Sequence, residues 1–340
     1  MPEPLPTQLL ALWAVFAGAG GAWLARRYAI ARSMLDQPGA RRSHSLPTPR
    51  GGGVGIVAAM VGAGLLLVAG GRIDATPGLA FVASLLMVAG VGWWDDHRDL
   101  SAAFRLLVHL AAGAVAALGV LGVPAGMAEV LALALATLWL AGMLNAWNFM
   151  DGINGIASGQ AVVVGLALWL VPGMLSAGWA LLAMVLAVAC AAFLPFNLPR
   201  ARIFLGDVGS GAIGFSIGVL LLTAAAASPP ASWPLVLLLC VVFLVDAGAT
   251  LAGRVVAGRR WWRPHREHAY QWAVRRGCSH FQVASAYALL GLLAAIMGGW
   301  LWPGEGPVGW WALAGWAVGL LVLRWWLKNK WLDSARGRRG

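Results

Sequence analysis

Long apolar runs recur along the whole chain and constrain its fold more than any other feature. Each run has about 17 to 22 residues, the length that a helix needs to cross roughly 30 Å of hydrocarbon. The chain is 60% hydrophobic and only 11% charged, whereas an average soluble domain has roughly 25% charged residues. We therefore expect an all-α, polytopic membrane helix bundle with about eleven spans, centred near Val15, Gly62, Leu86, Gly113, Leu135, Val164, Met184, Ile217, Leu239, Leu290 and Val318.

The positions of Lys and Arg between these runs predict the orientation. If the N-terminus lies in the periplasm, 23 of the 24 Lys and Arg residues fall in inward segments, and only Arg72 faces outward. Cytosolic loops of membrane proteins carry such an excess, so the C-terminus is expected in the cytosol. The net charge of +11 then reflects topology and attraction to anionic lipid and phosphate, and nucleic acid is not an expected partner.

The polar segments are too short to bury a core of their own, so we expect a single membrane domain over residues 1–340. Residues 328–340 are expected to form a basic cytosolic tail. The active site is expected in the cytosolic loops near residues 25–50, 95–104, 147–155, 196–209 and 254–279.

Acidic and amide side chains gather at the inward ends of the spans. Asp95 and Asp96 end the third span, Asp151 follows the fifth and Asp207 follows the seventh. A carboxylate at the centre of a bilayer costs roughly 3 kcal/mol or more, so such residues lie at a membrane edge or in a wet cavity and often mark function. Helices that end at one face can bring these groups together, which predicts a cavity for a metal ion and phosphates.

Phosphoryl transfer supplies a chemistry for such a cavity. Mg²⁺ prefers one or two carboxylates together with water and substrate phosphates, and Asp207 and Asn148 suit this role, with Mn²⁺ as an alternative ion. Asp95 or Asp96 could hold a base beside a lipid-borne nucleophile. Basic groups that could clamp diphosphate oxygens are Arg105, Arg202, Arg263, His265, Arg266 and His268.

Simpler interpretations compete at each position. Asp95-Asp96 could be a solvated helix end, and the Asp-Gly and Asn-Gly pairs at 151–155 could be turns. Asp207 or Ser210 could cap the eighth span. His109 and Asp246 lie within spans, where we expect packing or hydrogen bonding to neighbouring helices.

Five segments in this order resemble the polyprenyl-phosphate N-acetylhexosamine-1-phosphate transferases, the MraY/WecA superfamily, over nearly the whole chain. The segments that carry the resemblance are Arg42 to Gly53, Asp95 to Asp99, Asn145 to Gly159, Pro195 to Ser210 and Pro264 to His268. Members of this superfamily use Mg²⁺ to move a sugar-1-phosphate from a UDP-sugar to a polyprenyl phosphate, and UMP is released.

The resemblance also implies roles for individual residues. Asp207 would bind the metal with Asn148, Asp95 or Asp96 would act on the lipid phosphate, and Arg105 would hold a diphosphate oxygen. Phe204 would stack on uracil, and the basic loop from Arg263 to His268 would cover the phosphates or the sugar, with His268 as its catalytic member. The remaining residues assigned to the nucleotide and substrate are His44, Arg50, Asp151, Asn154, Asn197, Arg202 and Gly206.

One segment departs from the pattern of many relatives. Where they carry a cluster of His, this chain reads His268-Ala-Tyr-Gln271, which resembles the branch that initiates O-antigen and related surface polysaccharides. Its donors include UDP-N-acetylated deoxyhexoses. The expected substrates are therefore a UDP-amino sugar and undecaprenyl phosphate, at the cytosolic face of a bacterial inner membrane.

Several alternatives stay open at this stage. The chain could be a peptidoglycan phospho-MurNAc-pentapeptide transferase, and the transfer could pass through an aspartyl intermediate instead of a direct attack. A transporter would use its carboxylates along a pathway, but such sites tend to lie at mid-membrane between repeats. A scaffold for envelope enzymes is a third class, and the sequence also leaves a homodimer open.

Overall fold

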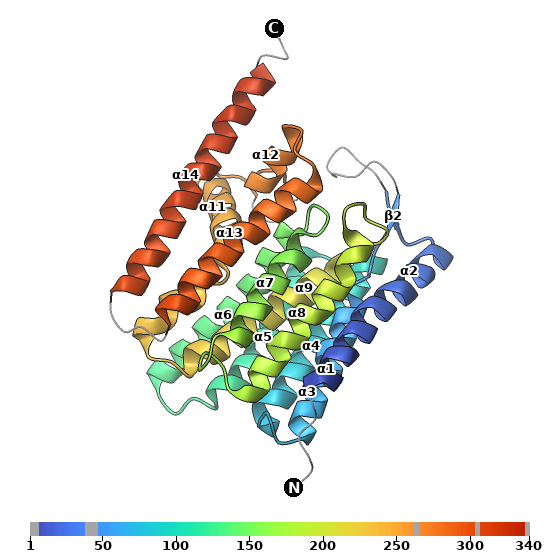
Figure 1. The fold of residues 1–340 in the computed structure, drawn as a ribbon. Helices are drawn as coiled ribbons and strands as arrows, with labels where there is room; N and C mark the ends of the chain where they lie inside the picture. The colour runs from blue at the N-terminus through green and yellow to red at the C-terminus, as the bar shows by residue number, and fades with distance from the viewer. Residues whose placement is uncertain (1–6, 38–46, 261–264, 303–306, 337–340) are drawn as a thin grey trace.

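The computed structural model describes residues 7–37, 47–260, 265–302 and 307–336, and this part is almost entirely helical (Figure 1). Its two strands, β1 (Leu35–Asp36) and β2 (Thr48–Pro49), are antiparallel, with Leu35 opposite Pro49. The helical elements of the first half are α1 (Thr7–Val15), the π-helical turn η1 (Phe16–Gly20), α2 (Gly21–Ala31), α3 (Val54–Ala69), α4 (Ala75–His97), α5 (Ala102–Leu121), α6 (Met127–Met150) and α7 (Ile156–Leu170). Those of the second half are α8 (Ala177–Asn197), α9 (Gly206–Ala226), the 3₁₀ turn η2 (Pro230–Ser232), α10 (Trp233–Leu238), α11 (Val241–Val256), α12 (Ala269–Arg275), α13 (His280–Leu301) and α14 (Val308–Arg336).

The helices show a multi-pass membrane protein, but the expected number of spans is not confirmed. Among the described residues, eight helices are long and apolar enough to cross a membrane, or nine if η2–α10 and α11, bent by 87°, form one span. The expected centres at Gly62 and Val164 lie in α3 and α7, which have 16 and 15 residues. A full crossing needs about 20. α7 is short because it begins after the turn at Gly155 and ends at Leu170, since Val171 adopts an extended conformation before Pro172.

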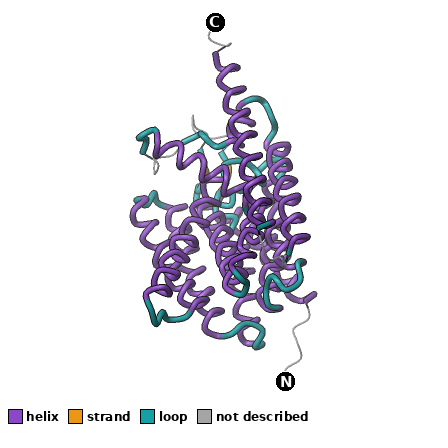
Figure 2. The backbone as a smooth tube through the Cα atoms, turned by 90° about the vertical axis from the view of Figure 1, so that its left-hand side faces the viewer, coloured by secondary structure: helices purple, strands orange, loops and turns teal. Residues whose placement is uncertain are grey.

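α9 is the centre of the bundle. In its most apolar stretch 83% of the residues are buried, against 6% for α14. α9 is packed by α3, α4, α6 and α7, whereas α13 and α14 stand together at one side with α11 and α12 (Figures 1 and 2). The core therefore surrounds α9, and several helices fix the position of the residues at its N-terminus.

The start of α1 and the end of α14 lie at opposite ends of the bundle (Figure 1). α14 continues to Arg336, so helix extends into the segment 328–340 that was expected as a basic tail. The orientation of the two ends across a membrane stays a prediction.

Backbone pairing fixes the chain around the start of α9. The Phe204 N–H donates to the Pro49 carbonyl at 2.8 Å, and the N–H groups of Gly52 and Gly53 donate to the carbonyls of Phe204 and Leu205 at 2.9 Å. The segment that follows β2 is thereby bound to the segment that precedes α9. This pairing brings Arg50 next to the ends of α4 and α6.

Candidate active site

A polar cavity lies where α4 and α6 end and α9 begins. Nine of the residues that line it were expected from the sequence, namely Arg50, Asp96, Asn148, Asp151, Asn154, Asn197, Phe204, Gly206 and Asp207. Segments far apart in the chain supply these side chains. The prediction that the inward ends of the spans converge is therefore consistent with the geometry.

Arg105 joins two carboxylates beside this cavity. Its Nη1 donates to Asp95 Oδ2 at 2.6 Å and to Asp207 Oδ2 at 2.9 Å. α5 places Arg105 in its first turn, where the Ser101 hydroxyl oxygen caps the helix by accepting from the Phe104 N–H. The side chains of Arg105 and Asp207 are each 32% exposed, so this ion pair remains open to a ligand.

The two adjacent aspartates have different surroundings. Asp96 is buried, and its Oδ1 and Oδ2 accept from the backbone N–H groups of Asp207 at 3.0 Å and Val208 at 3.2 Å. Arg50 Nη1 lies 4.0 Å from Asp96 Oδ1. Asp95 instead accepts from the Leu100 N–H and from Arg105. Asp96 therefore holds the first turn of α9, whose N–H groups have no partner within the helix.

Asn148, near the end of α6, contacts Asp207 and Ser210 in the first turn of α9. Its Nδ2 donates to Asp207 Oδ1 at 3.1 Å and lies 3.4 Å from the Ser210 hydroxyl oxygen. The Ser210 hydroxyl donates to the Gly206 carbonyl. Ser210 and Asp207 thus do not cap α9, since the cap comes from Asp96 on α4.

Two amides connect the loop after α6 to the segment after α8. Asn197 Nδ2 donates to the Ile203 carbonyl at 2.9 Å, and its Oδ1 accepts from the Gly155 N–H at 2.5 Å. Asn154 Nδ2 donates to the Pro199 carbonyl at 3.2 Å. Both side chains line the cavity, and their hydrogen bonds join the two segments that form its walls.

The carboxyl group of Asp151 lines the cavity and has a raised pKa. Burial raises the pKa of its carboxyl group to about 7, and the negative charge of Asp96 acts in the same direction. Asp151 follows the last residue of α6 and forms its C-terminal cap. The expected turn follows directly, with Gly155 in the left-handed region at φ 75°.

Phe204 and Gly206 form the part of the wall that leads into α9. Gly206 has a φ of 74°, and a Cβ there would lie 2.4 Å from Asp96 Oδ2 and 2.8 Å from the Gly51 nitrogen. Only glycine fits at this position. Phe204 lines the cavity, and its stacking on uracil stays a prediction.

Most of the basic residues expected around the phosphates do not line the cavity. Arg202 is exposed, and neither it nor Arg266, His265 or His268 belongs to the cavity lining. The His265 ring lies 5.0 Å from the His268 ring and 6.3 Å from the Phe149 ring. Burial lowers the pKa of His265 to about 4, with His268 and Arg254 adding to the effect, so His265 is neutral at pH 7 and offers hydrogen bonds instead of charge.

His268 is 2% exposed and is the N-cap residue of α12. It contacts Thr250 and Asp246, with Nδ1 3.3 Å from Thr250 Oγ1 and 3.8 Å from Asp246 Oδ1. Its catalytic role stays a prediction. The expected substrate residues His44 and Arg263 lie outside the described residues.

Sequence reasoning did not assign six of the lining residues, namely Asp36, Gly152, Ile153, Ser210, Gln271 and His280. His280 Nδ1 lies 3.4 Å from the Asn154 nitrogen, which donates to it. Asp36 lies in the loop near 25–50, and His280 directly follows the loop near 254–279. The available signal was that both loops were expected on the inward side with the other site residues.

The residues around Asp207 fit a hard cation. Four carboxylates, from Asp95, Asp96, Asp151 and Asp207, lie in or beside a cavity whose nearby guanidinium groups are Arg50 and Arg105. Within the described ranges, no three His, Cys, Asp or Glu residues are grouped to hold a metal. Mg²⁺ commonly needs only one or two carboxylates and completes its shell with water and substrate phosphates, which is the donor set that Asp207 and the amide oxygen of Asn148 offer.

The fold and the site together define a multi-pass membrane protein with a cavity lined by carboxylates and amides. The sequence model described as glycosyl transferase family 4 matches residues 78–225. A decaprenyl-phosphate N-acetylglucosaminephosphotransferase of Mycobacterium tuberculosis is 30% identical over 299 residues, covering 76% of this chain and 73% of the relative.

Two further relatives are similar over most of their length. A probable undecaprenyl-phosphate N-acetylglucosaminyl 1-phosphate transferase of Bacillus subtilis is 29% identical, covering 80% of this chain and 78% of the relative. The undecaprenyl-phosphate alpha-N-acetylglucosaminyl 1-phosphate transferase of Escherichia coli is 28% identical, covering 81% and 77%. The chain belongs to glycosyl transferase family 4, among the polyprenyl-phosphate sugar-phosphate transferases. It is therefore an enzyme, a phosphotransferase, which favours this class over the transporter and the scaffold.

Proposed function

We propose that this enzyme transfers an N-acetylhexosamine-1-phosphate, or its N-acetylated deoxyhexosamine counterpart, from a UDP-sugar to undecaprenyl phosphate. The products are undecaprenyl-diphosphate-sugar and UMP. The acceptor and the sugar class follow the names of the relatives, which act on undecaprenyl or decaprenyl phosphate and N-acetylglucosamine. The reaction would take place at the cytosolic face of a bacterial inner membrane and would initiate O-antigen or another surface polysaccharide.

One observation carries the proposal. Arg105 donates to both Asp95 and Asp207 at the edge of a cavity lined by Asn148, Asn154 and Phe204. A guanidinium between carboxylates supplies positive charge for a diphosphate, and an aromatic ring with amides suits a nucleobase.

The roles of the residues follow from their contacts. An oxygen of the lipid phosphate attacks the β-phosphorus of the donor, the bond from that phosphorus to the bridging oxygen breaks, and UMP leaves with this oxygen. Asp95 is the better base of the pair, because its side chain is 13% exposed against 1% for Asp96, whose two oxygens hold N–H groups of α9. Arg105 would turn from Asp95 and Asp207 to the diphosphate oxygens as the substrates bind.

Mg²⁺ at Asp207 and Asn148, when bound, would neutralise developing charge on the diphosphate oxygens. Asp207 also receives a hydrogen bond from Asn148, which fixes the direction of its carboxylate. Asp151 and Asn154 would contact the uridine, and Phe204 would stack on the uracil.

The test combines purified protein, undecaprenyl phosphate, Mg²⁺ and a panel of UDP-amino sugars. UMP release is measured, and mass spectrometry of the lipid product identifies the donor sugar. We expect release with at least one donor and none after chelation. No release with any donor, or full release without the lipid acceptor, would overturn the proposal. A product carrying phospho-MurNAc-pentapeptide would replace it with the peptidoglycan reaction.

A further inference from the structure

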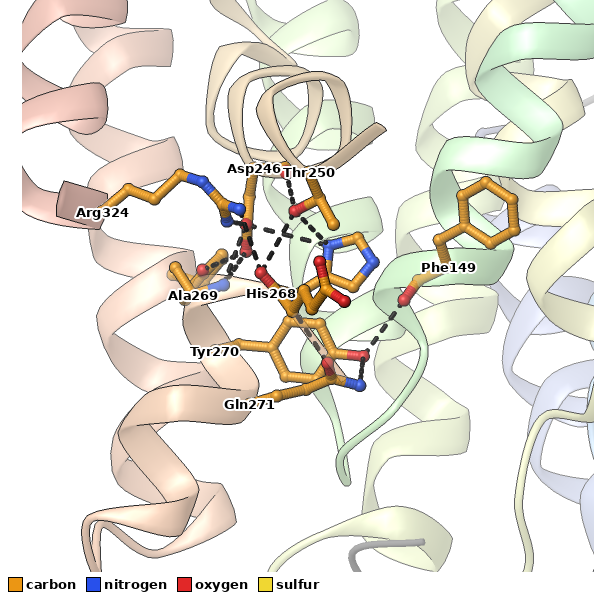
Figure 3. A network of polar contacts seen from close by, with 10 residues as sticks. Phe149, Asp246, Thr250, His268, Ala269, Tyr270, Gln271 and Arg324 are labelled. Carbon is orange, nitrogen blue, oxygen red and sulfur yellow. Dashed lines mark hydrogen bonds and ion pairs between the residues drawn. The ribbon is translucent and has the colours of Figure 1, made fainter. Parts of the chain in front are cut away.

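A second polar cluster lies beside the cavity, inside the group of helices α11 to α14. We call it the Asp246 cluster, and it consists of Asp246, Thr250, His268, Tyr287 and Arg324. Asp246 is 4% exposed and His268 is 2% exposed. Figure 3 shows Arg324 and Ala269 directed at the Asp246 carboxylate from two different helices.

The Asp246 carboxylate is saturated by donors. Arg324 Nη1 donates to its Oδ1 at 2.5 Å, the Tyr287 hydroxyl donates to its Oδ2 at 2.7 Å, and the Ala269 N–H lies 2.9 Å and 3.1 Å from the two oxygens. Arg324 Nη2 also donates to the Glu267 carbonyl at 3.0 Å. One buried ion pair thereby connects α11, α13 and α14 to the first turn of α12.

α12 carries this connection to the cavity. Tyr270 is 1% exposed, and its hydroxyl donates to the Phe149 carbonyl at 3.1 Å. Gln271 lines the cavity, where its Nε2 donates to the Tyr270 oxygen at 3.2 Å and its Oε1 accepts from the His268 N–H at 3.2 Å. The orientation of the Gln271 amide therefore depends on the backbone of His268 and on Tyr270 (Figure 3).

Tyr270 also supports the opposite wall of the cavity. A Cβ on Gly152 would lie only 2.1 Å from the Tyr270 hydroxyl oxygen, so the ring packs against the backbone between Asp151 and Ile153. These three residues line the cavity. A shift of α12 would thus move Gln271 and the loop at 149–153 together.

We propose that Asp246 and Arg324 are positioning residues, which hold α12 so that Tyr270 and Gln271 complete the cavity that binds the UDP-sugar. The last helix, little buried as it is, is then part of the catalytic apparatus through Arg324. This inference rests on the proposed function, because it assigns the donor to the same cavity. Asp246 and Arg324 themselves touch no reacting atom.

The test uses steady-state UMP release at varied UDP-sugar concentration. For Arg324→Met and Tyr270→Phe we expect the KM for the donor to rise about fivefold to tenfold with kcat changed less than about twofold, since each change removes one or two positioning hydrogen bonds. The double variant should resemble the more affected single variant, because both act on one link. Arg324→Lys keeps the charge and should recover part of the affinity.

Trp326→Leu is the matched control on the same helix. The Trp326 ring lies 5.6 Å from Cζ of Arg276, the C-cap residue of α12, so its loss weakens a different contact between α14 and α12 and leaves the Asp246–Arg324 pair intact. An unchanged donor KM in Arg324→Met or Tyr270→Phe, additive effects in the double variant, or an equal rise in Trp326→Leu would overturn the inference. Thermal unfolding of each variant identifies any that fail to fold, and Tyr270→Phe, which loses only a hydroxyl, keeps the test decisive.

Hydrogen exchange separates a failure of the inference from a failure of the proposed function. In Arg324→Met without any substrate, we expect amides of both α12 and residues 149–153 to exchange several-fold faster than in wild type and in Trp326→Leu. Unchanged exchange at 149–153 would overturn the link even if α12 loosens. If the wild type releases no UMP but both segments loosen together, the proposed function fails and the positioning link stands.

Discussion

Two carboxylate and arginine clusters lie near each other in this protein, and they differ in exposure and in balance. At the cavity, the side chains of Asp207 and Arg105 are each 32% exposed. In the Asp246 cluster, the side chains of Asp246 and Arg324 are 5% and 14% exposed. The first, which we call the open cluster, gathers the carboxylates of Asp95, Asp96 and Asp207 around the guanidinium groups of Arg50 and Arg105. The Asp246 cluster, which is closed to ligands, surrounds one carboxylate with hydrogen-bond donors.

The difference distinguishes a cluster that can bind a ligand from one that only holds neighbouring helices together. Asp246 receives hydrogen bonds from a guanidinium, a hydroxyl and a backbone N–H, so no oxygen is left in need of an external partner. Breaking such a buried pair is costly because one charge stays behind uncompensated. Asp207 retains exposed surface beside other carboxylates, and such an accumulation of carboxylates in a cavity is typical of a functional site.

The largest expected effect is in the open cluster. Asp207→Asn should lower kcat for UMP release by roughly 10²- to 10³-fold, since it removes the charged group proposed to hold the Mg²⁺ that neutralises the diphosphate oxygens. The fold should persist. Asp99→Asn, at an exposed residue beyond the end of α4, is the control and should change kcat less than about twofold.

The same variant tests the metal independently of turnover. Mg²⁺ should raise the thermal unfolding temperature of the wild type, because a ligand that binds only the folded state stabilises it. Asp207→Asn should lose this shift. An equal Mg²⁺ shift in both proteins would place the ion elsewhere.

Substitutions in the Asp246 cluster should reduce the stability of the protein before they reduce its activity. Asp246→Asn leaves Arg324 and Tyr287 without their charged acceptor, and we expect the free energy of unfolding to fall by about 3 kcal/mol. Chemical or thermal denaturation in detergent measures this loss. Asp74→Asn is the comparison, since Asp74 is exposed at the start of α4 and makes no side-chain capping bond. An Asp246→Asn protein as stable as Asp74→Asn would remove the distinction between the two clusters.

The adjacent aspartates should divide along the same line. Asp96→Asn replaces an acceptor of two N–H groups by an amide, so we expect about 1 to 3 kcal/mol less stability together with lower activity. Asp95→Asn should lower kcat with a smaller change in stability, because its side chain is 13% exposed against 1% for Asp96. Denaturation and UMP release measured on both variants decide this. The reverse pattern would make Asp96 the base.

The open cluster could be predicted from the sequence because its residues follow apolar runs at one face. The helices that carry Asp96, Asn148 and Asp207 end or begin at that face, so topology alone brings them together. The division of labour between Asp95 and Asp96 could not be predicted. Consecutive residues point about 100° apart on a helix, and only the packing of α4 against α9 decides which one caps α9.

The Asp246 cluster was only half visible. Hydrogen bonding of Asp246 to other helices was expected and is confirmed. Its partner Arg324 lies 78 positions away and reads in the sequence as a topology signal at a membrane edge. Pairing of this kind depends on how α11, α13 and α14 pack, which hydrophobic patterns do not encode. The lengths of α3 and α7, 16 and 15 residues, could likewise not be predicted, because turns at their ends shorten them.

Asp151 lines the cavity with Asp96 and Asp207 and should give the smallest effect. Burial first, and then the charge of Asp96, raise the pKa of its carboxyl group to about 7, whereas the unfolded chain has a value of about 3.9. Between about pH 4 and pH 7 the folded protein then binds more protons than the unfolded chain, so this group's contribution to the free energy of unfolding falls as the pH rises. Asp151→Asn stays neutral and should lack this slope in thermal unfolding without divalent cations, whereas Asp99→Asn should keep it. Identical slopes in the wild type and Asp151→Asn would mean that Asp151 is charged throughout this range and belongs fully to the open cluster.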